Sequence, residues 1–374
     1  VSFPAPPGVT MPVLTFTLRG AMAYSKLSGD EQCIIFSQLC NVLEPSVALA
    51  FSSTSSELRA LTPALRQQLR AGHEVVAALC LKMGHRFASL PAYRQGFYVP
   101  SSCKELREAT KLTMQVARSE EWDQANDGEE ELSAAELATL GTLGSVLPAL
   151  EELCLTSVDW SEDEITGVPI YLTELPASPG GVQRLVEGLG AGALPALIDF
   201  HLFGFHVGNA GASALAAALG RGALPQRLKK LVLINAGIGD AGLVALAPAL
   251  RRLPALVTLG LMLNPLGDEG LAALVAPPGY FVWAPLPAAG APLPQSGALP
   301  SHLDWVLEGL DLQRTHVTDA GCATLAAVLG SGGLLALDAL DLIGIPASAA
   351  AKAAVYTSRG SDSDECYISR DVDL

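Results

Sequence analysis

One spacing dominates the second half of this 374-residue chain. Five positions return 28 residues later with the same kinds of residue, since Leu228, Leu231, Leu233, Ile238 and Gly242 are followed by Leu256, Leu259, Leu261, Leu266 and Gly270. Leucines separated by one residue predict a short strand whose leucines point to one side, because side chains alternate along a strand. The apolar residues after each glycine recur at helical spacing and predict a helix over the same core. One such unit cannot bury its apolar face alone, so the units are expected to stack.

Further copies of this frame support a repeat architecture. They are Leu197, Phe200, Leu202, Val207 and Gly211; Leu307, Leu310, Leu312, Val317 and Gly321; and two weaker copies at Leu150, Leu153, Leu155 and Val158, and at Leu337, Leu340, Leu342 and Ile345. The turn before each strong helix carries an amide or a carboxylate, at Asn209, Asp240, Asp268 and Asp319. Such side chains cap helix N-termini, so each is predicted to cap the helix that it precedes.

The unit resembles the ribonuclease-inhibitor type of leucine-rich repeat, over roughly residues 132–357. This resemblance implies an α/β solenoid with a concave parallel sheet and a convex layer of helices. A solenoid with one exposed sheet usually holds another macromolecule, which favours a binding function.

Two long gaps between copies predict insertions, near residues 156–193 and 276–300. The second contains seven prolines, which exclude both helix and sheet, so we expect a loop. It is either a disordered excursion or a docking element, since Tyr280, Phe281 and Trp283 are suited to contact. The segments 1–26 and 358–374 are read as tails, the second one disordered because it is polar.

Charge and composition exclude several partners. The chain has 23 Lys and Arg against 38 Asp and Glu, a formal charge of −15, which opposes binding to nucleic acid or an anionic membrane. No apolar run approaches membrane length, and residues 1–26 lack the layout of a signal peptide. The seven cysteines are scattered and form no metal-ligand spacing, which indicates reduced thiols in the cytoplasm or nucleus and no metal or cofactor site.

Residues 27–83 predict a small helical unit, and residues 84–131 a helical linker with an acidic loop. The first part resembles an F-box in Ile35-Phe36-Ser37, Leu39 and Pro45, although Ser28 and Leu58 depart from that family's motif and about four residues are inserted before the turn. The resemblance implies that a Skp-type adaptor of an SCF ubiquitin ligase is bound by Leu27, Ile35, Phe36, Leu39 and Pro45. The alternative is a helical cap on the first repeat. An F-box would expose these side chains to a partner, whereas a cap would bury them against the repeat.

The repeat frame also predicts which side chains alternate with the buried leucines and face the concave side. The candidate partner-binding residues there are Asp199, His201, Phe203, Ile234, Met262, Asp311 and Asp341. Phe203, Ile234 and Met262 are expected to form an exposed apolar line, because they align across three neighbouring strands. The alternative is that they pack locally or stand exposed singly. Asp311 and Asp341 occupy equivalent positions and predict an acidic recognition surface.

The sequence favours a binding protein over an enzyme, because it has no phosphate loop, nucleophile elbow or HExxH motif. The leading hypothesis is an F-box-like substrate receptor whose repeats bind the target protein. The alternatives are a non-catalytic scaffold and a regulator similar to the Ran GTPase-activating family. The two insertions and the short tail count against the last of these.

Overall fold

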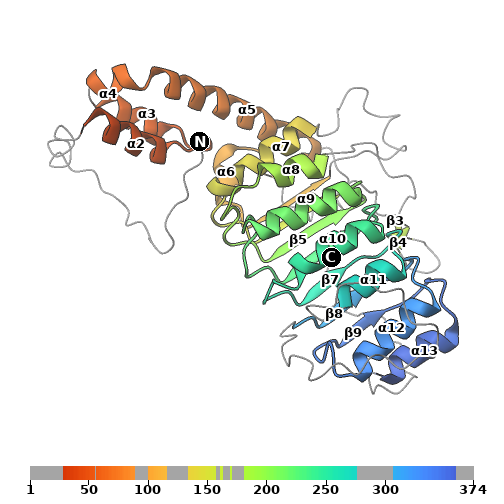
Figure 1. The fold of residues 1–374 in the computed structure, drawn as a ribbon. Coiled ribbons are helices and arrows are strands. Elements are labelled where there is room, and N and C mark those ends of the chain that lie inside the picture. Colours follow the sequence, from red (N-terminus) through yellow and green to blue (C-terminus); the bar gives the residue numbers. More distant parts are fainter. Residues whose placement is uncertain are drawn as a thin grey trace. The chain divides into compact units, whose positions relative to one another are not determined.

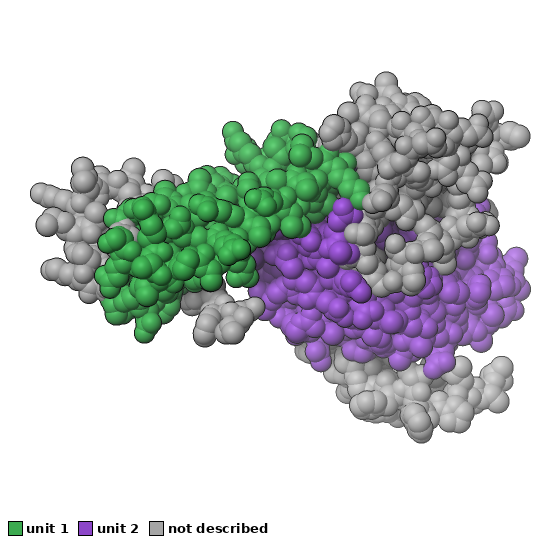
Figure 2. All heavy atoms as spheres, turned by 90° about the horizontal axis from the view of Figure 1, so that it is seen from above, with its two compact units in different colours: residues 1–109 green, residues 110–374 purple. Residues whose placement is uncertain are grey.

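The computed structural model describes residues 28–54, 56–88, 100–115, 134–156, 161–162, 169–170, 181–275 and 306–358. The chain divides into two compact units, residues 1–109 and 110–374 (Figure 2). Leu27, the segment 276–300 and the tails 1–26 and 359–374 lie outside the described residues. Within the described part, no helix combines the length and the apolar character that crossing a membrane would require.

The first unit is helical, as predicted for residues 27–83. Its helices are α2 (Gly29–Leu39), α3 (Ser46–Ser53), α4 (Ser56–Leu61), α5 (Pro63–Ala88) and α6 (Cys103–Glu108). A capping box starts α2, because the Ser28 backbone N–H donates to the Glu31 carboxylate at 2.8 Å and the Ser28 hydroxyl accepts from the Glu31 N–H. The unit has its own apolar core, formed by Phe36, Ala48, Phe51, Leu58 and Leu69.

The second unit contains a parallel sheet of seven strands among the described residues, in the order β1-β2-β5-β6-β7-β8-β9 (Figure 1). The strands are β1 (Lys111–Gln115), β2 (Glu152–Thr156), β5 (Asp199–Phe203), β6 (Lys230–Ile234), β7 (Thr258–Gly260), β8 (Gly309–Asp311) and β9 (Ala339–Asp341). The helices are α7 (Ala134–Thr142), followed by the 3-10 helix η2 (Leu143–Val146), then α8 (Gly181–Gly188), α9 (Gly208–Gly220), α10 (Asp240–Leu250), α11 (Asp268–Val275), α12 (Asp319–Gly330) and α13 (Ala349–Ser358).

Strands and helices alternate along the chain, and each of these helices packs against the next one in sequence (Figure 1). The leucines of the repeat frame fill the space between sheet and helices, so that Leu231, Leu233, Leu259 and Leu261 are fully buried. The predicted α/β repeat fold, with helices preceding it at the N-terminus, is therefore confirmed.

Strand β1 differs from the prediction of a helical linker over residues 84–131. Leu112 pairs in register with Leu153, and Met114 with Leu155, so β1 belongs to the same sheet. The helix-forming residues before it do form α6, but that helix ends at Glu108. Leu112 and Met114 are the residues that could have predicted this strand, since they have the spacing of the buried strand leucines. Their pattern was weak, because Ala109 occupies the first position of the repeat frame, where the other copies have leucine.

The predicted insertion at 156–193 also contains a helix of the repeat array. Helix α8 packs between α7 and α9 in the helical layer. Gly141 and Gly188 allow the close approach of α7 and α8, since a Cβ atom on Gly188 would lie 3.1 Å from the Gly141 Cα. The added structure that is described between β2 and α8 is a short antiparallel pair, β3 (Ser161–Glu162) and β4 (Pro169–Ile170).

The capping residues act on a different helix from the one predicted. Asn209 lies in α9, but its side-chain oxygen accepts from the backbone N–H groups of Gly239 and Gly242, at 2.9 and 3.0 Å. Asp240 accepts in the same way from Gly267 and Gly270, at 2.6 and 2.8 Å. Each side chain thus caps the helix of the following repeat, because the helices stack side by side with their N-termini aligned.

This ladder of caps continues along the array. Asp268 accepts from Thr318 and Gly321, and Asp319 accepts from Ser348 at the start of the last helix. The glycine of each receiving turn leaves room for the carboxylate or amide, since a Cβ atom on Gly242 would lie 2.6 Å from the Asn209 Oδ1. The glycine that defines the repeat in the sequence is therefore the receiving half of an inter-repeat contact.

A buried asparagine links the ends of β6 and β7. The Asn264 side chain is 1% exposed, and its oxygen accepts from the Ala236 and Ile238 backbones, both at 3.0 Å. Its amide donates to the carbonyls of Leu233, Leu261 and Met262. One side chain therefore makes hydrogen bonds to five backbone groups near the ends of the two strands.

Candidate functional site on the concave face

The concave face is the side of the sheet opposite the helices, and its side chains form three rows across the strands. Strand register aligns the first row and the second row, and hydrogen bonds just beyond the strand ends extend the third. The first row is Lys111, Glu152, Asp199, Lys230, Thr258, Gly309 and Ala339. The second row is Thr113, Cys154, His201, Val232, Gly260, Asp311 and Asp341. The third row is Thr156, Phe203, Ile234, Met262, Gln313 and Ile343.

The first row is charged and accessible. Lys111 and Glu152 form an ion pair at 2.8 Å, and this hydrogen bond raises the pKa of Lys111. Asp199 follows on the next strand and is half-buried, and its Oδ1 is buried without a hydrogen-bond partner. Lys230, Thr258 and Gly309 are also half-buried, so this row remains open to solvent across most of the sheet.

The second row is buried from β1 to β7. His201 is only 9% exposed, and its Nε2 makes no hydrogen bond. Burial lowers the pKa of His201, and the charge of Asp199 opposes this shift. The imidazole meets the Phe203 ring edge to face, with centroids 5.8 Å apart. Burial also raises the pKa of the neighbouring Cys154 to about 12, which keeps this thiol protonated at neutral pH.

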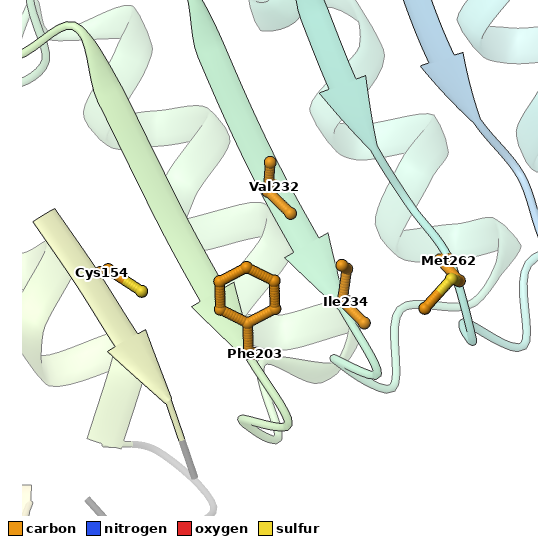
Figure 3. Close-up of a cluster of buried hydrophobic side chains, with 5 residues drawn as sticks. All are labelled: Cys154, Phe203, Val232, Ile234 and Met262. Atoms are coloured by element: carbon orange, nitrogen blue, oxygen red, sulfur yellow. The ribbon is translucent and has the colours of Figure 1, made fainter. Parts of the chain in front are cut away.

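The third row corrects the prediction of an exposed apolar line. Phe203, Ile234 and Met262 do align, but they are only 1%, 6% and 7% exposed. They form one buried cluster with Cys154 and Val232, and the partly buried Leu263 packs against it (Figure 3). Large apolar side chains at equivalent positions of strands about 4.8 Å apart contact one another. The alternative of local packing is the one observed.

The predicted acidic pair is present at the other end of the second row. Asp311 and Asp341 are in register on β8 and β9, and both are half-buried. Burial raises the pKa of Asp311 to about 6, and the charge of Asp341 contributes. The Asp341 oxygens accept from the Ile343 backbone at 2.9 Å and from the Gln313 side chain at 2.6 Å. Asp311 accepts from the Gln313 backbone at 2.9 Å.

The adaptor-binding residues predicted in the helical unit are placed differently from the expectation. Phe36 is 0% exposed and lies in the core of its own unit, so the prediction that it faces a partner is wrong. An aromatic residue on the inner side of α2, facing α3 and α4, is the natural centre of so small a core. Ile35 and Leu39 are half-buried against the same core, and Pro45 is half-buried in the turn before α3. The exposed large apolar residue of α2 is Ile34.

Comparison with known proteins supports the repeat reading. A family model described as leucine-rich repeat matches residues 254–275, which cover the whole of β7 and of α11. No curated protein matches the chain. This repeat contains Asn264 and receives the cap from Asp240, so the matched segment has the repeat signature both in sequence and in structure.

Proposed function

We propose that this protein is a non-enzymatic protein-interaction module, and that the concave face of its leucine-rich-repeat sheet binds the partner. The observation that carries the proposal is the accessible first row, which is charged from Lys111 to Lys230, together with the half-buried acids Asp311 and Asp341 in the second row. Ordered, charged side chains on a rigid sheet are suited to recognising another protein. We also propose that the repeats are of the ribonuclease-inhibitor type, because each repeating unit consists of a strand followed by a helix.

The chemistry of the face supports binding over catalysis. Cys154 and His201 are in register on adjacent strands, but the raised pKa of the thiol and the lowered pKa of the imidazole favour neutral forms of both. A neutral pair without an exposed thiol lacks the thiolate that nucleophilic catalysis requires.

Site-specific photo-cross-linking tests the proposal. A benzophenone side chain placed at Ile343, an exposed concave position, is expected to capture partner protein from extract. The matched control places the same group at Val244, an exposed position on helix α10. Equal capture at both positions, or capture only at Val244, would contradict the concave face as the binding surface.

The F-box-like receptor role is a second candidate. The feature that favours it is a set of apolar side chains left exposed on the helical unit, Ile34, Val47 and Leu61, at 57%, 46% and 47%. We propose that these residues, with Ile35, Leu39 and Pro45 beside them, contact a Skp-type adaptor. The helical unit would then connect a ubiquitin ligase to a target held by the repeats.

A further inference from the structure

Two polar atoms on β5 lack the hydrogen bonds that buried atoms normally make. The Oδ1 of Asp199 and the Nε2 of His201 are both buried without a partner, and the two residues are neighbours on the same face of the strand. A buried polar atom without a hydrogen-bond partner destabilises the folded state. Both atoms can accept a hydrogen bond, since the pKa of His201 is lowered and a neutral imidazole accepts at Nε2 when its proton is on Nδ1.

The neighbouring charges do not satisfy Asp199. Lys111 is engaged by Glu152 at 2.8 Å, and Lys230 makes no ion pair with Asp199 in the described structure. Asp199 and Glu152 both act on His201 as negative charges, and Lys230 acts on it from the other side. The group that would complete this site is therefore a cationic hydrogen-bond donor.

A second acceptor lies further along the face. The Asp341 oxygens are both occupied, whereas Asp311 uses only its Oδ1, for the Gln313 backbone. The strand positions beside Asp311 in the first and second rows are Gly309 and Gly260, which place no side chain of their own against the half-buried carboxylate.

The two acceptors match the repeat of an extended peptide. His201 and Asp311 share the second row, and their strands β5 and β8 are separated by three strand spacings in the sheet order, which is roughly 14 Å. Residues four apart in an extended chain are also about 14 Å apart, and their side chains point the same way. Lys230 lies between the two acceptors, so it disfavours a third positive charge in the middle of the bound peptide.

We propose that the concave face binds an extended segment of a partner protein that carries two basic residues four positions apart, the first at Asp199 and His201 and the second at Asp311. This inference rests on the proposed function and specifies the chemistry of the partner. Arginine suits the first site, because its planar guanidinium donates several hydrogen bonds to neighbouring acceptors. The net charge of −15 favours a basic partner over an acidic one.

Fluorescence anisotropy with defined peptides and the full chain tests this inference. The probe is a labelled alanine- and serine-based peptide with two arginines four positions apart. The control peptides carry citrulline, which has the same shape without the charge, or two arginines two positions apart. We expect the citrulline peptide to bind at least about tenfold more weakly, and the closer spacing about fivefold more weakly.

Matched protein variants distinguish binding at this site from a general attraction of basic peptides to an acidic protein. Asp199→Asn and Asp311→Asn are each expected to weaken binding of the arginine peptide about tenfold, and Lys230→Gln to strengthen it. Glu269→Gln removes an exposed acid of α11 and is expected to change nothing. Circular dichroism checks that every variant is folded.

The possible outcomes distinguish this inference from the proposed function. Equal binding of the citrulline peptide, or equal weakening by Glu269→Gln and Asp199→Asn, overturns the basic-peptide site. If cross-linking at Ile343 still captures partner protein in that case, the concave face remains the binding surface and only the partner chemistry is wrong. Capture confined to Val244 overturns both.

Discussion

The Asp240 carboxylate lies in α10, and it accepts a 2.8 Å hydrogen bond from the Gly270 backbone in the helix of the next repeat. It also accepts from Gly267 at 2.6 Å. A carboxylate at a helix N-terminus is stabilised by the helix dipole as well as by the hydrogen bonds. The cap therefore couples the stability of one repeat to that of its neighbour.

The first prediction follows from this coupling. Asp240→Ala should lower the free energy of unfolding by about 1–2 kcal/mol, the usual loss for an N-cap. Asp240→Asn should cost less, because it keeps an acceptor. Urea denaturation measures both, with Glu308→Ala as the exposed acidic control outside the helices. A loss as large for Glu308→Ala would mean that the cap contributes nothing specific.

Asn264 gives the second prediction. Replacing it by alanine leaves buried backbone donors and acceptors at Ala236, Ile238 and Leu233 without partners, so we expect a loss of about 2–4 kcal/mol. The control Gln226→Ala changes an exposed amide in the turn before β6. Thermal and chemical denaturation of both variants compare them, and similar stabilities would refute the role assigned to Asn264.

The buried leucines give the third prediction. Leu233→Ala and Leu261→Ala should each destabilise the repeat unit by about 2–5 kcal/mol, because both side chains are fully buried. Chemical denaturation is the measurement. Losses under about 0.5 kcal/mol at both sites, the level of surface changes, would contradict the strand register.

The fourth prediction concerns pH. The pKa of Asp311 is raised to about 6 from its ordinary value of 3.8, so the folded state binds a proton more tightly than the unfolded state does. Ionised Asp311 therefore disfavours the folded state above pH 6, and the penalty disappears below about pH 4. Asp311→Asn should raise stability at pH 7 by about 1–3 kcal/mol and have little effect at pH 4.

Denaturation at several pH values measures this effect. The control Glu308→Gln neutralises an exposed acid immediately before β8 and should leave the pH profile of stability unchanged. A gain for Asp311→Asn that is the same at pH 4 and pH 7 would show that ionisation of Asp311 is not its cause.

The fifth prediction tests the adaptor role. Ile34→Asp and Val47→Asp change exposed apolar side chains, so they should abolish binding of a Skp-type adaptor to the full chain while leaving the fold intact. Phe36→Ala changes the core of the helical unit, so it should destabilise that unit by about 3–5 kcal/mol. Pull-down with purified adaptor measures binding. Absence of binding by the unchanged protein would eliminate the receptor hypothesis.

The repeats were predictable from sequence because leucine periodicity reports directly on burial. The alternation of Leu231 and Leu233 identified both the strand and its buried side. The exposure of the side chains on the other face of each strand, opposite the buried leucines, was not predictable in the same way. Phe203, Ile234 and Met262 occupy surface positions of the repeat, yet they are buried and packed in one cluster, and this packing depends on neighbours brought together only by stacking. The sequence likewise could not show that the Oδ1 of Asp199 and the Nε2 of His201 lack hydrogen-bond partners, because this depends on the three-dimensional arrangement of their neighbours.

The helix that each capping side chain caps could also not be predicted from the sequence. Asn209 stands at the position of a cap for its own helix, and its true recipients, Gly239 and Gly242, are about one repeat away. Local patterns identify residue types that cap helices, but only the packing of α9 against α10 determines which helix N-terminus comes within reach.

The inter-repeat caps have a consequence for insertions. Asp240 reaches Gly270 across 30 positions of sequence, whereas Asp268 makes the equivalent bond to Gly321 across 53. The same atomic contact is kept although the intervening chain is almost twice as long. Neighbouring repeats are thus held in phase by side chains and not by the length of the connection. The connection between α11 and β8 is therefore a place where new sequence can be accepted, exchanged or trimmed while the stack retains its alignment.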